Sequence, residues 1–331
     1  MRCAVIGAGA WGTALADLLA TSGHEVRIWA LESDVVESIN ATHENTRFLA
    51  GARLTPTLVA TRDQAEALDR AQLVVYATPS THLRSIARAA ATCVHPDAIL
   101  AVASKGIELG SMALMTDVIA AEVTHHAVVA LSGPSFAVEV AERQPTAIVA
   151  ASEAPSAARF VQKAMSSATF RIYTHDDVVG VELGGALKNV MAVATGILEG
   201  VGLGFNSRAA LITRGLAEMT RLGMSLGASA STFAGLAGIG DLVLTCTGSL
   251  SRNRSLGVEI GKGKNLEEAR AGKETVAEGV VTTASAIELA TREGVEMPIA
   301  EMVYRILFDH HPAQLAAQEL MKRELRAEQD E

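Results

Sequence analysis

The sequence predicts an α/β protein in which a doubly wound, mostly parallel sheet occupies the N-terminal half and helices alone occupy the C-terminal half. Short apolar runs alternate with helical patterns as far as residue 177, and a glycine-rich turn follows the first run. From residue 178 onward, β-branched strand patterns give way to helical segments interrupted by glycines. A single core rarely grows far past roughly 250 residues. The 331 residues therefore predict two domains, 1–177 and 178–331.

The first domain opens with a strand, a turn, a helix and a second strand. Residues 3–6 form the first apolar run, a helical pattern of leucines ends at Gly23, and the next apolar run covers 25–29. A unit of this length suits a right-handed crossover between parallel strands. Further strands are expected at 73–76, 99–102, 127–131 and 147–150.

Composition and charge exclude several classes of protein. The net charge of -9, from 28 basic and 37 acidic residues, is unsuited to a nucleic-acid surface. The apolar stretch 224–240 is rich in glycine and serine and ends at Asp241, so we expect no membrane span. Three isolated cysteines and histidines without ligand spacing indicate a reducing, cytoplasmic location and no metal site.

The glycine-rich turn carries the most specific motif of the first domain. The residues Gly7-Ala8-Gly9-Ala10-Trp11-Gly12 match the pattern G-x-G-x-x-G between a strand and a helix. Gly7 suits the tight turn, Gly9 allows close approach of a pyrophosphate, and Gly12 lets helix and strand pack closely. Glu32, twenty residues after Gly12, is placed to bind an adenosine ribose hydroxyl. The segment therefore predicts binding of a dinucleotide.

Two further loops follow predicted strands of the same sheet. Lys105 follows the strand that ends near residue 103, and Ser132-Gly133-Pro134-Ser135 follows the strand at 127–131. Ligands of open α/β sheets bind at this carboxyl edge, and loop amides there can hold an anion. A solvated surface lysine and an ordinary capped turn are the alternatives, and the two loops alone do not decide between them.

The segment 182–189 is the most informative part of the second domain. Gly184 and Lys188 are four residues apart and share a helix face. Glycine inside a helix costs about 1 kcal/mol relative to alanine, so we expect Gly184 and Gly185 to admit a cofactor or substrate close to the backbone. Tight packing between helices, with a surface lysine, is the alternative.

An acidic and a basic motif follow. Asp241 ends a glycine-rich apolar stretch and is followed by Thr245. A carboxylate in such surroundings needs a partner, such as a lysine or a substrate hydroxyl. In Ser251-Arg252-Asn253-Arg254 the two arginines are two apart, so only one of them is expected to face a ligand. Its guanidinium is well suited to hold a phosphate at two oxygens.

With these motifs the chain resembles the bacterial-type NAD(P)-dependent glycerol-3-phosphate dehydrogenases. The segments GAGAWGTALA, THEN, SKGIE, SGPSFA, GALKNV, AGIGDLVLTC, SRNR and VAEGV occur in the family's order and at its intervals across essentially the whole chain. The resemblance implies reversible, NAD(P)H-dependent reduction of dihydroxyacetone phosphate to sn-glycerol 3-phosphate, which supplies the backbone of phospholipids. It also implies a small-molecule phosphate as the substrate, and we expect a homodimer.

The resemblance also implies roles for individual residues. Lys188 is implied to transfer the proton and to contact substrate, helped by Lys105 and Asp241. Substrate contacts are expected at Lys105, Gly133, Ser135, Lys188, Asn189, Asp241, Thr245, Ser251, Arg252 and Asn253. Contacts to NAD(H) or NADP(H) are expected at Gly7, Gly9, Ala10, Trp11, Gly12, Leu31, Glu32, Lys105, Ala137, Arg252, Val276 and Glu278.

One position departs from the family. Leu31 stands where family members commonly carry a basic residue, and Glu32 follows it. An acid at this place favours the 2'-hydroxyl of NAD, whereas a cation favours the 2'-phosphate of NADP. We therefore predict use of both cofactors, with NADH at least as good as NADPH. The alternative is that Glu32 faces solvent and Arg53 or another basic residue reaches the phosphate.

Two other functions remain open from the residues alone. The chain could be another two-domain dehydrogenase that acts on a hydroxyacid or an acyl-CoA, or a non-catalytic sensor of NAD(P)H. A sensor needs the glycine loop but has no use for Lys105, Lys188 and Asp241 near the nicotinamide. Loss of NADH absorbance on addition of dihydroxyacetone phosphate distinguishes these possibilities.

Overall fold

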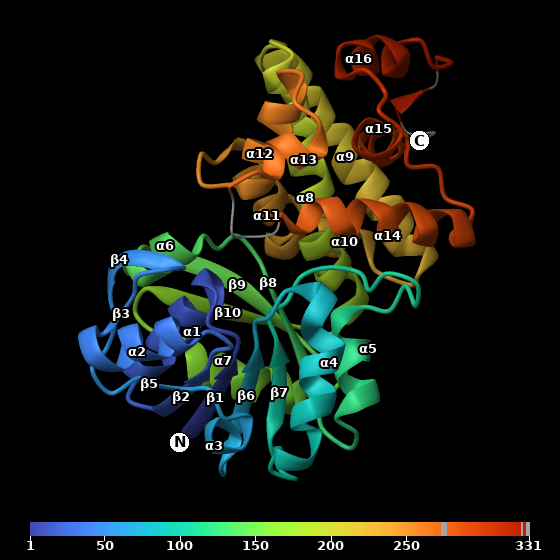
Figure 1. Cartoon of the computed structure of the whole chain (residues 1–331). Helices are drawn as coiled ribbons and strands as arrows, with labels where there is room; N and C mark the ends of the chain where they lie inside the picture. The colour runs from blue at the N-terminus through green and yellow to red at the C-terminus, as the bar shows by residue number, and fades with distance from the viewer. Residues whose placement is uncertain (273–276, 326, 329–331) are drawn as a thin grey trace. The chain divides into compact units, whose positions relative to one another are not determined.

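The computed structural model describes residues 1–272, 277–325 and 327–328. The chain divides into two compact units (Figure 1). The first contains residues 1–105 and 113–182, and the second contains 106–112 and 183–331. Helix α8 (Val178–Gly200) begins in the first unit and continues into the second. The division falls inside α8 after Glu182, and the loop 106–112 groups with the second unit.

The first unit is built on an eight-stranded sheet in the order β10-β9-β8-β7-β6-β1-β2-β5. Every neighbouring pair is parallel except β8 with β9, so the predicted doubly wound, mostly parallel sheet is confirmed. The strands are β1 (Arg2–Ile6), β2 (Glu25–Trp29), β5 (Val59–Thr61), β6 (Leu73–Tyr76), β7 (Ile99–Val102), β8 (Val128–Ser132), β9 (Thr146–Ala151) and β10 (Phe170–His175).

The sequence pattern did not reveal β5, β10 or the small hairpin of β3 (Glu44–Asn45) and β4 (Leu49–Arg53). β5 has only three residues. In β10, buried and exposed residues alternate from Phe170 to Tyr173, so this strand contains no continuous apolar run. Both strands lie at the edges of the sheet, where an apolar run is not required.

Helices cover both faces of this sheet, and alternation along each strand divides the core into two. In β1, Cys3 and Val5 face one core while Ala4 and Ile6 face the other, because successive side chains of a strand point to opposite faces. The first core packs against α1 (Ala10–Thr21), α2 (Ser33–Thr42), α6 (Ala137–Ala141) and α7 (Pro155–Met165). The second packs against α3 (Gln64–Leu68), α4 (Ser80–Ala90) and α5 (Met115–Glu122).

In the part of the second unit that the structure describes, the regular elements are all helices, as the sequence predicts. After α8 come α9 (Phe205–Ser225), α10 (Ala230–Phe233), the π-helical turn η2 (Leu236–Gly240), α11 (Asp241–Thr247), α12 (Arg252–Gly261), α13 (Leu266–Arg270), α14 (Glu278–Glu293), α15 (Pro298–Phe308) and α16 (Ala313–Met321).

Glycines bring α8 and α12 into backbone contact. A Cβ at Gly196 of α8 would lie 2.1 Å from the carbonyl oxygen of Arg254, and one at Gly257 of α12 would lie 2.2 Å from that of Val193. Real Cβ atoms do not approach so closely, so these positions require glycine. Gly200 likewise meets Gly261, so these contacts hold α12 along the C-terminal half of α8.

Two helical stretches are long and apolar enough to cross a membrane by length and composition, Val178–Gly200 and Ala230–Thr247. The most apolar window of the first is 83% buried inside the protein, as in a core helix. The window in the second is 44% buried, and Gly238 interrupts that stretch with non-helical dihedral angles. Packing within the helical unit accounts for the apolar character of the first stretch.

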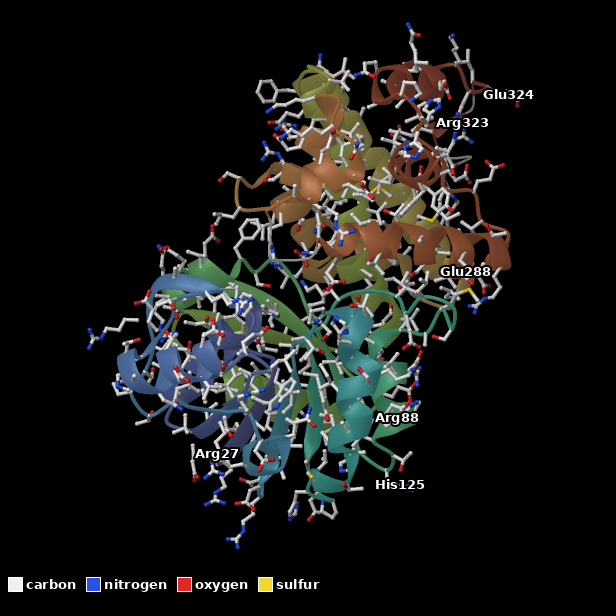
Figure 2. All side chains as sticks on the ribbon, in the orientation of Figure 1. Arg27, Arg88, His125, Glu288, Arg323 and Glu324 are labelled. Atoms are coloured by element: carbon white, nitrogen blue, oxygen red, sulfur yellow. The ribbon has the colours of Figure 1, made fainter. Side chains whose placement is uncertain are left out.

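Charged side chains cover the outside of each unit. Arg88 and His125 on the first unit and Glu288 and Arg323 on the second are exposed and project outward in Figure 2. The buried charged groups Glu218, Lys188 and Asp241 each have a partner inside their own unit.

Glu218 of α9 is one of these buried groups. Its carboxylate accepts hydrogen bonds from the amides of Ile299 and Ala300, at 2.7 and 3.3 Å, and so caps the N-terminus of α15. Burial raises the pKa of Glu218 from about 4.5 to about 7, although these amides act in the opposite direction. The folded state therefore holds a proton that the unfolded state has lost between these two pH values.

We predict that the wild type becomes less stable as pH rises from 4.5 to 7 and that Glu218→Gln abolishes this pH dependence. The raised pKa means that folding is disfavoured progressively through this window, by roughly 1 to 3 kcal/mol in total. Urea unfolding at pH 5 and pH 7.5 measures it: relative to wild type, the variant should gain stability at the higher pH. The exposed neighbour variant Glu301→Gln is the control, and an offset from wild type that is the same at both pH values would contradict the assignment.

Candidate active site

The glycine-rich turn after β1 has the geometry that its sequence predicts. Gly7 has φ +114°, and a Cβ there would lie 2.8 Å from the carbonyl oxygen of Ala77. A Cβ at Gly12 would lie 1.9 Å from the carbonyl oxygen of Gly7. Both positions therefore exclude any side chain. Gly9 differs, because a Cβ there would meet open space.

These features fit a bound dinucleotide. Gly9 is the N-cap of α1, no side chain caps the helix, and its first turn contains no acidic residue. The amides at this helix end are thus available to an anion, and the helix dipole favours one there. The Nε1 atom of Trp11, in the first turn of α1, is buried without a hydrogen-bond partner among the described residues. Ala10 is the first residue of α1 and is partly exposed.

The two residues expected near the adenosine ribose follow β2. Leu31 is 66% exposed, and Glu32 is the N-cap residue of α2. The carboxylate of Glu32 does not cap the helix. It therefore remains available at the carboxyl edge of the sheet, where the fold places an adenosine ribose.

At the same edge of the first unit, Lys105 and the loop after β8 come together. Lys105 Nζ donates a hydrogen bond to the carbonyl oxygen of Gly133 at 3.3 Å, and Ser135 Oγ donates to the same oxygen at 3.0 Å. Gly133 has φ +142°, and a Cβ there would lie 2.9 Å from Ile148 Cα. Ala137 begins helix α6 directly after this loop. The structure thus brings Lys105, Gly133 and Ser135 together.

In the second unit, Lys188 and Asp241 form a buried ion pair. The Nζ atom of Lys188 contacts Oδ1 of Asp241, with the side chains 11% and 0% exposed. Thr245 lies one turn after Asp241, and its hydroxyl contacts Asp241 Oδ1 at 3.3 Å and donates to the Asp241 carbonyl at 2.7 Å. The partner that the sequence requires for the Asp241 carboxylate is therefore Lys188.

Amide side chains continue this site along α8 and α12. Asn253 Nδ2 donates to Asn189 Oδ1 at 2.9 Å, and Asn253 Oδ1 accepts from the amide of Gly279 at 2.9 Å. Glu278, the first residue of α14, directly precedes Gly279. Ser251 caps α12 by accepting from the Arg254 amide at 3.2 Å. Arg252 is exposed at the first turn of α12, whereas Val276 lies outside the described residues.

The expectation that Gly184 admits a ligand is wrong, and tight packing explains the residue instead. A Cβ at Gly184 would lie 2.4 Å from the carbonyl oxygen of Ala237, in the η2 turn that precedes Asp241. Gly184 and Lys188 share a face of α8, so the same close contact places Lys188 beside Asp241. The glycine therefore serves the site by bringing two backbones together.

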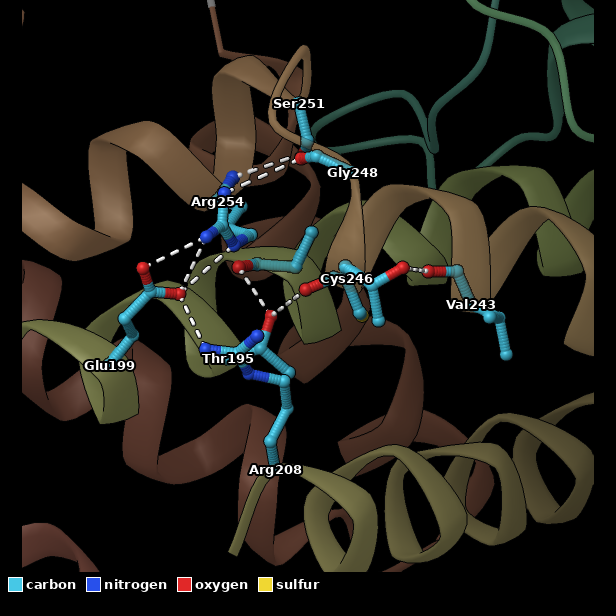
Figure 3. Close-up of polar contacts among 10 residues, drawn as sticks. Thr195, Glu199, Arg208, Val243, Cys246, Gly248, Ser251 and Arg254 are labelled. Carbon is cyan, nitrogen blue, oxygen red and sulfur yellow. Dashed lines mark hydrogen bonds and ion pairs between the residues drawn. The ribbon is translucent and has the colours of Figure 1, made fainter. Parts of the chain in front are cut away.

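A cluster that the sequence motifs did not reveal holds α12 in place. Glu199 near the end of α8 binds Arg254 through both carboxylate oxygens, at 2.8 and 2.7 Å, and accepts from Arg208 Nη2 at 2.7 Å (Figure 3). Arg254 Nη1 also reaches the carbonyl oxygen of Gly248 at 3.4 Å. Of the two arginines in the SRNR motif, Arg254 is thus held inside the unit. The sequence indicated this difference only through the spacing of the two arginines, which predicts that only one of them faces a ligand.

The first unit has a dinucleotide-type glycine loop on a mostly parallel sheet. The second unit is helical and contains a buried lysine and carboxylate. This combination defines a two-domain dehydrogenase of the nicotinamide class. Comparisons with known proteins agree. The family model described as the N-terminus of NAD-dependent glycerol-3-phosphate dehydrogenase matches residues 2–158, and that of the C-terminus matches residues 177–318. The chain belongs to this family of NAD(P)-dependent oxidoreductases.

Individual relatives are similar over their whole length. The chain is 53% identical to the glycerol-3-phosphate dehydrogenase [NAD(P)+] of Geobacter sulfurreducens, over 99% of this chain and 98% of that protein. Among solved structures, it matches glycerol-3-phosphate dehydrogenase from Coxiella burnetii with a TM-score of 0.94 at 40% identity, covering 97% of this chain and 99% of that one. The enzyme from Saccharomyces cerevisiae matches with a TM-score of 0.83 at 27% identity, covering 98% and 99%.

We predict that Gly184→Ala lowers turnover because the added methyl group separates α8 from η2 and moves Lys188 away from Asp241. Overpacking of this kind costs roughly 1 to 3 kcal/mol of stability. Steady-state kinetics together with thermal unfolding measure both effects. Gly204→Ala is the matched control, since that glycine in the same unit has open space at its Cβ and negative φ. Wild-type turnover in Gly184→Ala would show that the close contact does not position the pair.

Proposed function

We propose that this chain catalyses the reversible reduction of dihydroxyacetone phosphate to sn-glycerol 3-phosphate with NAD(P)H, and so supplies the backbone of phospholipids. The observation that carries the proposal is the buried Lys188–Asp241 ion pair in a chain that matches the glycerol-3-phosphate dehydrogenase family in both halves.

Lys188 is proposed to protonate the substrate oxygen. A nicotinamide dinucleotide, when bound, would supply the hydride that reduces C2 of the ketone, and negative charge would then grow on the carbonyl oxygen. A cation placed there stabilises this charge more in the transition state than in the ground state. Asp241 contacts Nζ of Lys188 and thereby orients the group that transfers the proton. Thr245 and Asn189 hold their neighbours in this arrangement.

Arg252 is proposed to bind the substrate phosphate, with Ser251 and Asn253 of the same unit. Lys105, Gly133 and Ser135 of the first unit are proposed as substrate contacts on the family's pattern. The support is the difference between the two arginines of the motif. Arg254 is committed to Glu199, whereas Arg252 is exposed and forms no ion pair within the part of the chain that the structure describes. An arginine without an internal partner is suited to grip a phosphate at two oxygens.

Dinucleotide binding is proposed for the glycine loop, Lys105, Ala137 and Glu278. Open space at Gly9, the uncapped start of α1 and the buried Nε1 of Trp11 support this assignment. Arg252 and Val276 are proposed to contribute on the family's pattern alone. Leu31 and Glu32 support the use of both cofactors, with NADH at least as good as NADPH.

We further propose a cytoplasmic homodimer. Three free cysteines suit a reducing compartment. Phe205 at the start of α9 is 83% exposed on the helical unit, and a large exposed aromatic side chain suits a subunit contact. Sedimentation analysis of the purified protein tests the oligomeric state.

We predict that Lys188→Ala lowers kcat by at least about 100-fold while dinucleotide affinity stays within a few-fold, because proton transfer by a positioned group contributes roughly two to four orders of magnitude. NADH oxidation on addition of dihydroxyacetone phosphate measures turnover. Removal of Lys188 alone leaves the buried Asp241 without its partner, so the double variant Lys188→Met with Asp241→Asn controls for misfolding. Retention of more than about a tenth of wild-type kcat would refute the role of Lys188.

We predict that Arg252→Ala raises KM for dihydroxyacetone phosphate, because a charge-assisted phosphate contact worth roughly 1.5 to 3 kcal/mol is lost. Unphosphorylated dihydroxyacetone should be a very poor substrate of the wild type, and at saturating NADH its kcat/KM should be little affected by the substitution. Arg292→Ala, on the exposed end of α14, is the control. Comparable kcat/KM for the two ketones in the wild type would mean that the substrate class is wrong.

A further inference from the structure

The short edge strand β5 brings a cation next to the residues that follow β2. β5 pairs with β2 in parallel register, Thr61 opposite Trp29, so that Arg62 lies beside the end of β2. Arg62 Nε donates a hydrogen bond to the carbonyl oxygen of Leu31 at 3.1 Å. The Arg62 carbonyl in turn accepts from Trp29 Nε1 at 2.9 Å. Both the backbone and the side chain of Arg62 are therefore anchored to β2 and its continuation.

The charge of this guanidinium is not compensated within the described part of the chain. Arg62 is exposed and forms no ion pair there, and neither does the nearby carboxylate of Glu32. Arg47 is the instructive contrast, since it forms an ion pair with Asp34 in the first turn of α2, at 3.4 Å. Arg53, the basic residue that the sequence offered, ends β4 opposite Glu44 in the hairpin.

We propose that Arg62 determines how well this chain accepts NADPH, by binding the 2'-phosphate of the adenosine ribose, while Glu32 accepts a hydrogen bond from the 2'-hydroxyl of NADH. The inference rests on the proposed dinucleotide-dependent function and deepens it. Arg62, the residue after β5, thereby supplies the cation that position 31 lacks because it is a leucine. A phosphate and a guanidinium form strong charge-assisted hydrogen bonds, whereas a phosphate next to Glu32 alone would be repelled.

The separate origins of Arg62 and Glu32 explain how one site serves two cofactors. The guanidinium rests on a main-chain carbonyl and forms no ion pair with Glu32, so neither charge neutralises the other. With NADH the acid provides the specific contact, and with NADPH the arginine offsets the cost of placing a phosphate near that acid. Because the cation follows β5 and does not occupy position 31, the acid and the cation can each contact the ribose substituent of a different cofactor.

A purely structural role for Arg62 leads to a different expectation. If the side chain served only to satisfy the Leu31 carbonyl, its loss would affect the ribose region in the same way for both cofactors. A surface carbonyl can also accept a hydrogen bond from water, so this bond is not required for folding. Discrimination between phosphorylated and unphosphorylated ribose is therefore the property that separates the two roles.

Isothermal titration of the full-length protein with AMP and with 2',5'-ADP tests the proposal without any catalytic step. Arg62→Ala should weaken 2',5'-ADP binding roughly 10- to 100-fold, the effect of one lost charge-assisted contact, and leave AMP binding within about threefold. Arg47→Ala should leave the ratio of the two affinities unchanged, because Asp34 already neutralises that arginine. Glu32→Gln should strengthen 2',5'-ADP binding relative to AMP.

Equal weakening of both ligands by Arg62→Ala would reduce Arg62 to a structural role and overturn the proposal. So would a selective loss of 2',5'-ADP binding in Arg47→Ala with none in Arg62→Ala. The ratio of kcat/KM for NADPH and NADH should shift in the same direction as the ratio of the fragment affinities. If the wild type binds both fragments as expected but does not reduce dihydroxyacetone phosphate, the proposed substrate is wrong while the assignment of Arg62 stands.

Discussion

The buried ion pair of Lys188 and Asp241 is the interaction on which the rest of the helical unit depends. Removing two charges from water costs several kcal/mol for each ion, and only close contact between them with further hydrogen bonds offsets that cost. Asp241 is fully buried, and Lys188 and Thr245 both reach its carboxylate. Such a pair is a poor way to gain stability. Its retention in the core therefore points to chemistry.

Glycines make this pair geometrically possible. Gly184 lets α8 touch the backbone of η2 at Ala237, and Gly196 and Gly257 let α8 touch α12. Each glycine in a helix costs about 1 kcal/mol of intrinsic preference, and here the close packing of backbones offsets that cost. As a result α8 carries Lys188 to Asp241 and Asn189 to Asn253 with the same rigid backbone. The partly buried Glu199–Arg254 ion pair joins the same two helices next to the Gly196 contact.

The fold class followed from the sequence because apolar periodicity is a local property. The central strands β2, β6 and β7 have the predicted bounds, and the glycine loop has the predicted conformation, since only one backbone geometry suits Gly7 and Gly12. Edge strands are different. β5 has three residues and no apolar run, so its pairing with β2 is decided by tertiary contact, and the position of Arg62 could not be predicted. Gly184 was misread because the sequence does not show which backbone faces a helical glycine.

The arginines of this chain divide according to whether the protein itself neutralises them. Arg254 and Arg47 are paired with Glu199 and Asp34 and serve to hold loops and helices together. Arg252 and Arg62 are exposed and form no ion pair with the residues that the structure describes. In a protein of net charge -9, long-range attraction for an anionic substrate or cofactor is weak. Recognition of phosphate must then come from individual cations whose charge the fold leaves uncompensated. Arg252 and Arg254 are only two residues apart in the sequence, yet one is exposed for a ligand and the other forms an internal ion pair.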